Sequence, residues 1–271
     1  MHPNSSNQVR FADRQCKLVV VQDQLQPCPY LDGVTARMPL QLPVGSVTPA
    51  ITDRLLENGY RRSGDFVYRT QCPSCTECLP TRIETSTFQF TKSMKRVLQR
   101  GDRELVALWD QPEVDSRRVE LFNLHREQRS LGRGDEVDAE SYRSFLVESC
   151  CDSLELKICL DDKLIAIAIV DIGQSSVSAV YTFFDPAMSR YSLGTYALLK
   201  TIQWARQSER PFVYLGMYVA ANRHLNYKAR FSPQQRLIRG EWVDVDDRKI
   251  NDPKSGSRSG NVVSGSRANH E

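Results

Sequence analysis

Three evenly spaced cysteines are the residues of this sequence best suited to chemistry. In YRTQCPSCTEC, two residues separate Cys72 from Cys75 and Cys75 from Cys78, and Cys28 lies alone upstream. Thiolates at such gaps can turn toward one ion or cluster, because a short chain segment curls around it. These three thiols and the remote one supply four ligands, so we predict a metal or redox site. Four thiolates suit either a zinc ion or an iron–sulfur cluster, and the sequence leaves that choice open.

The bulk composition favours an ordinary soluble protein. The 271 residues include 40% hydrophobic and 25% charged residues, enough for one large domain or two modest ones. The start of the chain is polar, and the longest apolar run, at 164–170, is far shorter than a membrane span. We therefore expect a cytoplasmic protein with few disulfides. Cys150, Cys151 and Cys159 stand in apolar surroundings and are predicted to be small buried side chains.

A local run of cations is more informative than the net charge of +3. Lys92, Arg96, Arg100 and Arg103 recur at spacings of four, four and three, which places them on one face if the segment is helical. Residues 91–103 hold five Lys or Arg and one acid, a local charge of +4. Such a stripe is usually a solvated helix face. Beside independent evidence for nucleic acid, it becomes a candidate contact with phosphates.

The elements that must position these residues form two halves between two polar ends. Residues 1–15 and 247–271 have too little to bury and are predicted to be disordered. In the first half, the patterns predict a helix over 48–58 that stops at Gly59, then strands over 65–69 and 82–90.

The second half has the clearer pattern. It predicts a helix over 139–151, strands over 154–160, 164–172 and 177–184, a helix over 192–207, and a strand over 212–218. This order resembles that of a GNAT-type acyltransferase. In that fold, a helix start marked by glycine, here Gly194, receives an anionic group of the acyl donor, since free N–H groups favour negative charge.

Seven segments, in order, carry a closer resemblance. They are CPYL at 28–31, ENGYRRSGDFVYR at 57–69, CPSCTECLPTRI at 72–83, KSMKRVLQRGDREL at 92–105, SAVYTFFDP at 178–186, SLGTYALL at 192–199 and YLGMYVAANRHLNYKARFSP at 214–233. Together they make the chain resemble the bacterial aminoacyl-tRNA–protein transferases, the leucyl-transferring relatives of the eukaryotic arginyl-tRNA–protein transferases.

The resemblance implies an enzyme of the N-degron pathway. It would transfer an aminoacyl group, leucyl in the first place, from charged tRNA to the N-terminal Asp or Glu of a protein and so mark that protein for degradation. It also implies an α/β (α+β) fold of two GNAT-like units with mostly antiparallel mixed sheets and flanking helices. The first unit, degenerate and Cys-bearing, would span 16–137, and the aminoacyltransferase unit would span 138–246. The implied partners are aminoacyl-tRNA and acidic N-termini, with no membrane.

Three departures from the family pattern lie beside the expected active site. Gly216-Met217-Tyr218-Val219 stands where leucyl-type enzymes usually read Gly-Tyr-Trp-Ile, and Tyr218 is closer to the arginyl type. Asn222 replaces a common Cys or Ser, and His224-Leu225 replaces a common Lys-Met. Transfer of arginine therefore stays open as an alternative.

The implied reaction, aminolysis of an activated ester, requires no cofactor. It needs a deprotonated amine, alignment with the ester carbonyl, and donors for the oxyanion. A pocket for an acidic side chain should present Arg or Lys. On these grounds the catalytic candidates are Tyr181, Tyr218 and His224, and the substrate-binding candidates are Arg61, Arg62, Thr182, Gly194 and Lys228. The tRNA-binding candidates are Lys92, Arg96, Arg100 and Arg103.

Two other classes of protein compete with this hypothesis. An acetyltransferase using acetyl-CoA explains the second half and Gly194, but leaves the cysteines and the basic stripe unexplained. A non-enzymatic zinc-ribbon module that binds RNA explains the cysteines and the stripe, but assigns no function to the long second half.

Overall fold

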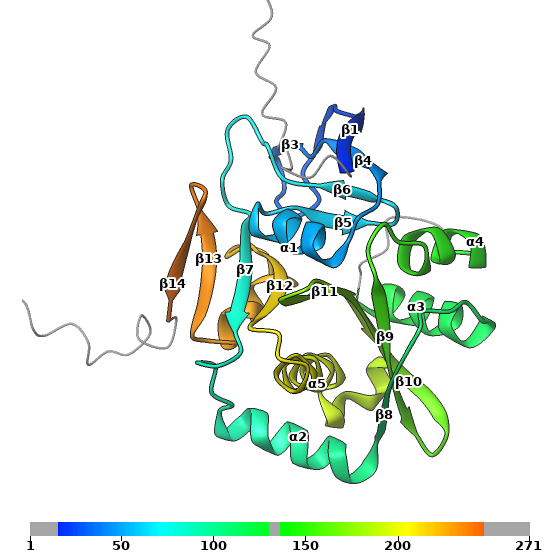
Figure 1. Ribbon diagram of the computed structural model, residues 1–271. Coiled ribbons are helices and arrows are strands. Elements are labelled where there is room, and N and C mark those ends of the chain that lie inside the picture. The colour runs from blue at the N-terminus through cyan, green and yellow to red at the C-terminus, as the bar shows by residue number, and fades with distance from the viewer. Residues whose placement is uncertain (1–15, 130–135, 247–271) are drawn as a thin grey trace, which may run out of the picture.

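A large sheet forms the centre of the computed structural model, which describes residues 16–129 and 136–246 (Figure 1). The predicted disordered ends, 1–15 and 247–271, lie outside the described residues. The sheet has eight strands in the order β14-β13-β7-β12-β11-β10-β9-β8. Their bounds are β7 Leu79–Glu84, β8 Val106–Asp110, β9 Ser153–Leu160, β10 Lys163–Ile172, β11 Ser176–Phe184, β12 Phe212–Tyr218, β13 Gln234–Ile238 and β14 Glu241–Val245.

The strands β11 and β12 diverge inside this sheet. They are its one parallel pair among the described strands, and they are paired only where they begin, from Ser176 opposite Phe212 to Ser178 opposite Tyr214. Beyond these residues the two strands separate toward their carboxyl ends, which leaves backbone groups on both facing edges outside the ladder. On its other edge β12 stays paired with β7, through a bulge between Tyr214 and Gly216.

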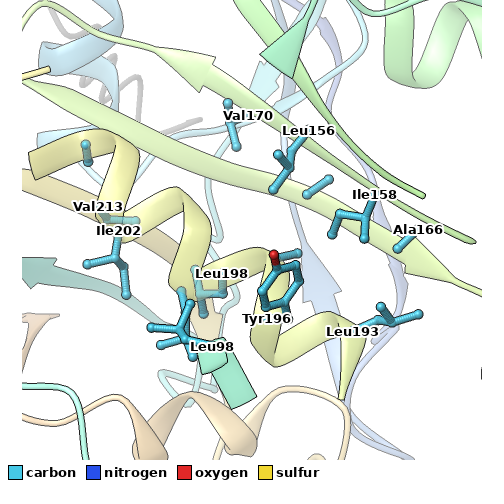
Figure 2. Close-up of a cluster of buried hydrophobic side chains, with 14 of the residues drawn as sticks. Leu98, Leu156, Ile158, Ala166, Val170, Leu193, Tyr196, Leu198, Ile202 and Val213 are labelled. Carbon is cyan, nitrogen blue, oxygen red and sulfur yellow. The ribbon is translucent and has the colours of Figure 1, made fainter. Parts of the chain in front are cut away.

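Two helices cover one face of the sheet. They are α2 (Lys92–Glu104) and α5 (Leu193–Gln207), and their apolar residues pack against β9, β10 and β12 in the largest core. Figure 2 shows part of this core, where Leu98 of α2 and Tyr196, Leu198 and Ile202 of α5 gather beneath the strands. The helices approach closely at Gly101, where a Cβ atom would lie 2.2 Å from the ring of Tyr196.

The opposite face carries α3 (Ser116–Gln128), α4 (Ala139–Tyr142) and the π-helical turn η1 (Arg143–Val147). The predicted helix over 139–151 is therefore shorter, because the backbone becomes extended at Glu148. Cys150 and Cys151 fall in the following loop. These two cysteines and Cys159 are half-buried, not fully buried as predicted. Within the described ranges, no helix is long and apolar enough to cross a membrane.

The N-terminal part forms a smaller sheet with one helix. Its strands run in the order β1-β4-β6-β5, with bounds β1 Cys16–Gln22, β4 Leu40–Gly45, β6 Phe66–Tyr68 and β5 Arg61–Ser63. A separate hairpin consists of β2 (Leu25–Pro27) and β3 (Thr35–Arg37). The predicted helix over 48–58 is confirmed as α1 (Pro49–Glu57), and Thr48 caps it by accepting the N–H of Ile51. The residues buried between this helix and the sheet are Cys16, Ile51, Leu55, Tyr60 and Val67.

The predicted strands of the first half are partly correct. The strand over 65–69 is confirmed as β6, whereas the strand over 82–90 begins and ends earlier, as β7. It ends because the chain turns at Glu84, whose carbonyl accepts the N–H of Phe88 at 3.1 Å, and Phe88 is then buried in the core.

The predicted fold class is confirmed: the fold is mixed α/β, with mostly antiparallel sheets and flanking helices. The meander β9–β11, the helix α5 and the strand β12 follow in the predicted order. The large sheet also contains β7 and β8, so it draws strands from both sides of the predicted boundary at 137/138. The division into two units stays a prediction.

Candidate active site at the divergence of two strands

The guanidinium group of Arg61 lies in the opening between β11 and β12. It comes from β5; its Nη1 donates to Ser178 Oγ at 3.1 Å, and its Nη2 donates to the carbonyl of Ala179 at 2.9 Å. Ala179 is the first residue of β11 beyond the parallel ladder. On the β12 side, a Cβ atom at Gly216 would lie 3.1 Å from Nη2. Arg61 therefore sits against both strands where they separate.

A second cation, Lys228, lies beside Arg61. It belongs to η3 (Asn226–Arg230), a 3-10 turn that follows β12, and it is only 4% exposed. Its Nζ is 4.9 Å from the ring centroid of Tyr227. Burial, with a smaller contribution from the cation of Arg61, lowers the pKa of Lys228 to about 7, because both disfavour the ammonium form.

Half-buried Arg61 and buried Lys228 have no carboxylate partner among the described residues, in contrast to two buried arginines. Arg62, also on β5, pairs with Asp171 of β10 at 2.9 Å, and Arg118 pairs with Glu155 at 2.6 Å. Among the described residues, no carboxylate lies within ion-pair distance of Arg61 or Lys228. Two neighbouring cations without an internal counter-ion form a receptor for an anion.

Arg62 does not join Arg61 in this opening. Its side chain is 2% exposed, and it also donates to the carbonyls of Phe145 and Glu148. This placement holds β5 to the large sheet and gives no support to the predicted contact of Arg62 with substrate.

Tyr181 likewise lies in a packed core. Its ring contacts those of Phe122 and Phe145, with centroids 5.5 and 5.7 Å apart. Burial raises the pKa of Tyr181, which keeps the phenol protonated. The geometry therefore gives Tyr181 a packing role, the ordinary alternative for a tyrosine on a buried strand.

Tyr218 and His224 lie at and after the end of β12. The guanidinium carbon of Arg236 is 3.8 Å from the ring centroid of Tyr218. His224 is half-buried, and its Nε2 accepts from Arg223 Nε at 3.2 Å. Burial, Arg223 and Arg129 lower the pKa of His224, so its imidazole is neutral at pH 7.

The start of α5 lies at the carboxyl end of β11. A Cβ atom at Gly194 would lie 3.1 Å from Phe184 Cε1, and half-buried Thr182 stands two residues earlier on the same strand. Ser192 precedes the helix in a left-handed conformation, and its side chain makes no capping bond. The first N–H groups of α5 are therefore free of a side-chain cap on the side where β11 and β12 open.

Tyr30 is a residue of this region that the sequence patterns did not single out. Its carbonyl accepts from Asn222 Nδ2 at 2.9 Å, which ties the 28–31 segment to the loop after β12. Burial, Tyr68 and Cys78 raise the pKa of Tyr30, whereas the cation of Arg61 lowers it. Tyr30 thus lies within electrostatic reach of both Cys78 and Arg61. Its membership of the CPYL segment was the one signal for it in the sequence.

Cys78 lies within electrostatic reach of the other three predicted thiols. Burial, followed by Cys28, Cys72 and Cys75, raises the pKa of Cys78 to about 12. Crowded thiols of this kind suit a cation, so the donor chemistry fits zinc or a cluster. In residues 16–129 and 136–246, however, no group of three or more His, Cys, Asp or Glu is arranged to hold a metal ion. The predicted close convergence is absent there, and metal binding stays a prediction.

The basic stripe lies on a helix, as its spacing required. Lys92, Arg96, Arg100 and Arg103 are all exposed on α2. Arg100 donates to the carbonyl of Arg190, and Arg103 pairs with Glu104, whereas Lys92 and Arg96 have no ion pair with any described residue. Figure 1 shows α2 on the α5 side of the large sheet and β5, which carries Arg61, on the other side. The stripe and the cation pair are separate sites.

Comparison with known proteins gives the same family over both halves. A model described as "Arginine-tRNA-protein transferase, N terminus" matches residues 26–96, and one described as "Arginine-tRNA-protein transferase, C terminus" matches residues 117–238. The solved structures that match this chain have low sequence identity to it. The C-terminal domain of a lysylphosphatidylglycerol synthetase from Agrobacterium fabrum is 12% identical, with a TM-score of 0.44 over 73% of this chain and 70% of that one. L-PGS from Bacillus licheniformis is 12% identical, with a TM-score of 0.43 over 77% and 76%.

Curated relatives match along most of their length. The aspartate/glutamate leucyltransferase of Acinetobacter baylyi is 32% identical over 79% of this chain and 80% of the relative. The protein of the same name from Chromobacterium violaceum is 34% identical over 80% of this chain and 89% of the relative. That of Thiobacillus denitrificans is 34% identical over 79% and 90%. Two domain models match in sequence, and the curated relatives are 32–34% identical over 79–80% of this chain, so the chain belongs to the arginine-tRNA-protein transferase family.

Proposed function

We propose that this chain transfers leucine from leucyl-tRNA to proteins whose N-terminal residue is Asp or Glu, and so marks them for degradation in the cytoplasm. The observation that carries the proposal is the pair of half-buried Arg61 and buried Lys228, for which no described residue supplies a carboxylate partner. The donor, leucine, follows from the relatives, which are named aspartate/glutamate leucyltransferases.

The proposed reaction places the two substrates at the opening of β11 and β12. The α-amine of the protein attacks the ester carbonyl of leucyl-tRNA, the new amide forms, and the 3′ oxygen of the tRNA leaves with a proton. The backbone N–H groups freed where β11 and β12 separate, and those of the first turn of α5 near Gly194, are the nearby donors for the oxyanion. Tyr218 and His224 are the candidates for handling the proton, and Thr182 for contacting the substrate.

The remaining sites have supporting roles in this proposal. Arg61 and Lys228 hold the acidic side chain, and the α2 stripe contacts tRNA phosphates. The four thiols Cys28, Cys72, Cys75 and Cys78 support the 28–31 segment, which carries Tyr30 toward Arg61. Ester aminolysis proceeds without thiol chemistry, so their role is structural, with or without a bound zinc ion or cluster.

A single assay separates the donor and acceptor hypotheses. The protein is incubated with a mixture of charged tRNAs, acetyl-CoA, and peptides that begin with Asp, Glu, Asn, Gln or Ala, and the products are identified by mass. We expect leucine on the Asp and Glu peptides alone. Arginine on the same peptides would show that the donor is arginyl-tRNA and not leucyl-tRNA. Acetylated peptides formed without tRNA would overturn the proposal. Lys163→Met, at an exposed turn, should behave as wild type, whereas Arg61→Met should lose the acidic products.

A further inference from the structure

Arg61 and Lys228 are neighbouring cations that repel each other, and only Lys228 can reduce this repulsion by losing its proton. Lys228 is buried and Arg61 is half-buried, and no described carboxylate forms an ion pair with either. An arginine keeps its proton in any protein environment, whereas a buried lysine can release its proton at moderate pH. Lys228, at 4% exposure, is therefore the group whose charge depends on what enters the opening.

In the part of the chain that the structure describes, Lys228 has no ion pair with a carboxylate. Its own turn contributes the neutral phenol of Tyr227, and β5 contributes Arg61. The neighbouring strand β12 carries Tyr214 and Tyr218, whose rings face Arg82 and Arg236 at 5.8 and 3.8 Å.

Polar contact with β13 does not change this balance. Gln234 of β13 donates its Nε2 to the Lys228 carbonyl at 2.8 Å, which fixes the backbone of the turn and leaves Nζ untouched. Because no residue in 16–129 or 136–246 pairs with Nζ, a bound ligand is our candidate for the stabilising anion.

Resting on the proposed function, we propose that in mildly alkaline solution Lys228 is uncharged in the free enzyme and takes up one proton from solvent when the carboxylate of an acidic N-terminal residue binds between it and Arg61. The bound state then contains two cations and one anion, in place of one cation alone. A peptide with a neutral N-terminal side chain supplies no anion and causes no uptake. Lys228 thus makes recognition of acidic N-termini sensitive to pH.

The direction of the pH effect follows from linkage. The pKa of Lys228 is lowered to about 7 by burial and Arg61, and a bound carboxylate raises it. Below pH 7 the free enzyme already carries the proton. Above pH 7 each unit of pH should weaken binding of the acidic peptide about tenfold, up to the pKa of the complex. Between pH 6 and pH 8 the accumulated loss is about tenfold.

Kinetics of Lys228→Arg provides the matched comparison. Arginine keeps the cation at every pH, so the variant should still prefer Asp over Asn peptides but without pH control. The ratio of wild-type to variant kcat/KM for one Asp peptide cancels the titration of the peptide amine and the alkaline lability of leucyl-tRNA. We expect this ratio to fall about tenfold from pH 6 to pH 8. In Lys228→Met the preference for Asp should be lost at both pH values, and Lys163→Met should match wild type.

A direct measurement does not depend on turnover. The ¹³Cε resonance of Lys228, assigned by its absence in Lys228→Arg, reports the charge of the amine in the full chain without tRNA. At pH 8 we expect the uncharged form in the free enzyme, the charged form after addition of an Asp peptide, and no change with the matched Asn peptide.

The two proposals fail in different ways. A charged Lys228 at pH 8 in the free enzyme, or a kcat/KM ratio that does not change with pH while leucine is still transferred, overturns the proton uptake alone. Absence of leucyl transfer to Asp and Glu peptides by the wild-type protein overturns the proposed function.

Discussion

Gly216 decides whether the arginine of the candidate site can reach its place. The backbone there has φ +88°, which L side chains rarely adopt, and the absence of a side chain lets Arg61 Nη2 approach β12. The same guanidinium bonds to Ser178 and Ala179 of β11. One glycine thus permits one arginine to sit between two strands.

Replacing Gly216 by alanine should therefore impair catalysis beyond its effect on stability. The new Cβ would meet Arg61 Nη2 at 3.1 Å, so the guanidinium would have to move by a few tenths of an ångström. Misplacement of a substrate-positioning group by about 1 Å can lower the rate roughly 100-fold, so we expect this smaller shift to lower kcat/KM by about 10-fold. The backbone conformation alone should cost about 1–3 kcal/mol in the free energy of unfolding.

Gly240 provides the control for this substitution. It has φ +89° in the β13–β14 turn, and a Cβ atom there has nothing within 4 Å. Gly240→Ala should carry a comparable conformational cost in urea denaturation and leave kcat/KM near wild type. Equal losses of activity in both variants would show that strain, and not the position of Arg61, limits the reaction.

At the scale of elements, periodicity predicts the parts of this fold whose buried positions are apolar. The meander β9–β11 and the helix α5 follow such patterns and were predicted nearly to their ends. Helix α3 was missed because Arg118 and His125 take two of its buried positions, where a periodic pattern needs apolar residues. The strands β2, β3 and β5, which were not predicted, are three residues long, too short for alternation to stand out.

The site was harder to predict than the elements for a geometric reason. Neighbouring residues on a strand point to opposite faces, so Arg61 and Arg62 on β5 face different partners. The partners of Arg61 lie 117 and 118 positions away in the sequence, and Asp171 lies 109 positions from Arg62. The sequence predicts a substrate-binding cation among these two arginines. Only the tertiary contacts show which of them lies in the opening between β11 and β12.

The helix α2 makes a prediction about tRNA that is separate from catalysis. Lys92 and Arg96 are exposed and have no ion pair with a described residue, so their charges are available to phosphates. Lys92→Gln with Arg96→Gln should weaken tRNA binding and flatten the log–log salt dependence by about 0.7–0.9 for each phosphate that is no longer neutralised. Saturating turnover should change little, because phosphate contacts position the tRNA without touching the ester.

The control for the stripe removes the same charge elsewhere. Lys17 and Lys163 are exposed on β1 and at the start of β10, and neither belongs to α2. Binding of charged tRNA is measured for both double variants between low and moderate salt. If the α2 variant keeps the wild-type slope, or if both variants change it equally, the stripe is an ordinary solvated helix face.

At the scale of the whole molecule, the N-terminal and C-terminal halves depend on each other. The first half contributes β7 and β8 to the large sheet, and it contributes Arg61 to the opening between two strands of the second half. The adjacent Arg62 ties the small sheet to the large one through Asp171, which also accepts from Ser153 Oγ at 2.7 Å. The ion pair that Arg62 makes therefore helps to hold the strand that presents Arg61.

Breaking this tie should destabilise the molecule strongly. Asp171→Asn would leave Arg62 charged, buried and without a counter-ion, and removal of one partner of a buried pair typically costs about 3–5 kcal/mol. We expect a loss of that order in urea denaturation, because the side chains are only 2% and 4% exposed. The control is Asp23→Asn, which removes the partner of Arg37 in a pair with side chains 30% and 43% exposed and should change stability far less.

Because β5 carries both arginines, Asp171→Asn should also lower transfer to Asp peptides at temperatures where the protein is still folded. If Asp171→Asn is as stable as wild type, the ion pair of Arg62 does not stabilise the fold. If the variant is unstable but fully active when folded, that ion pair does not determine the position of Arg61.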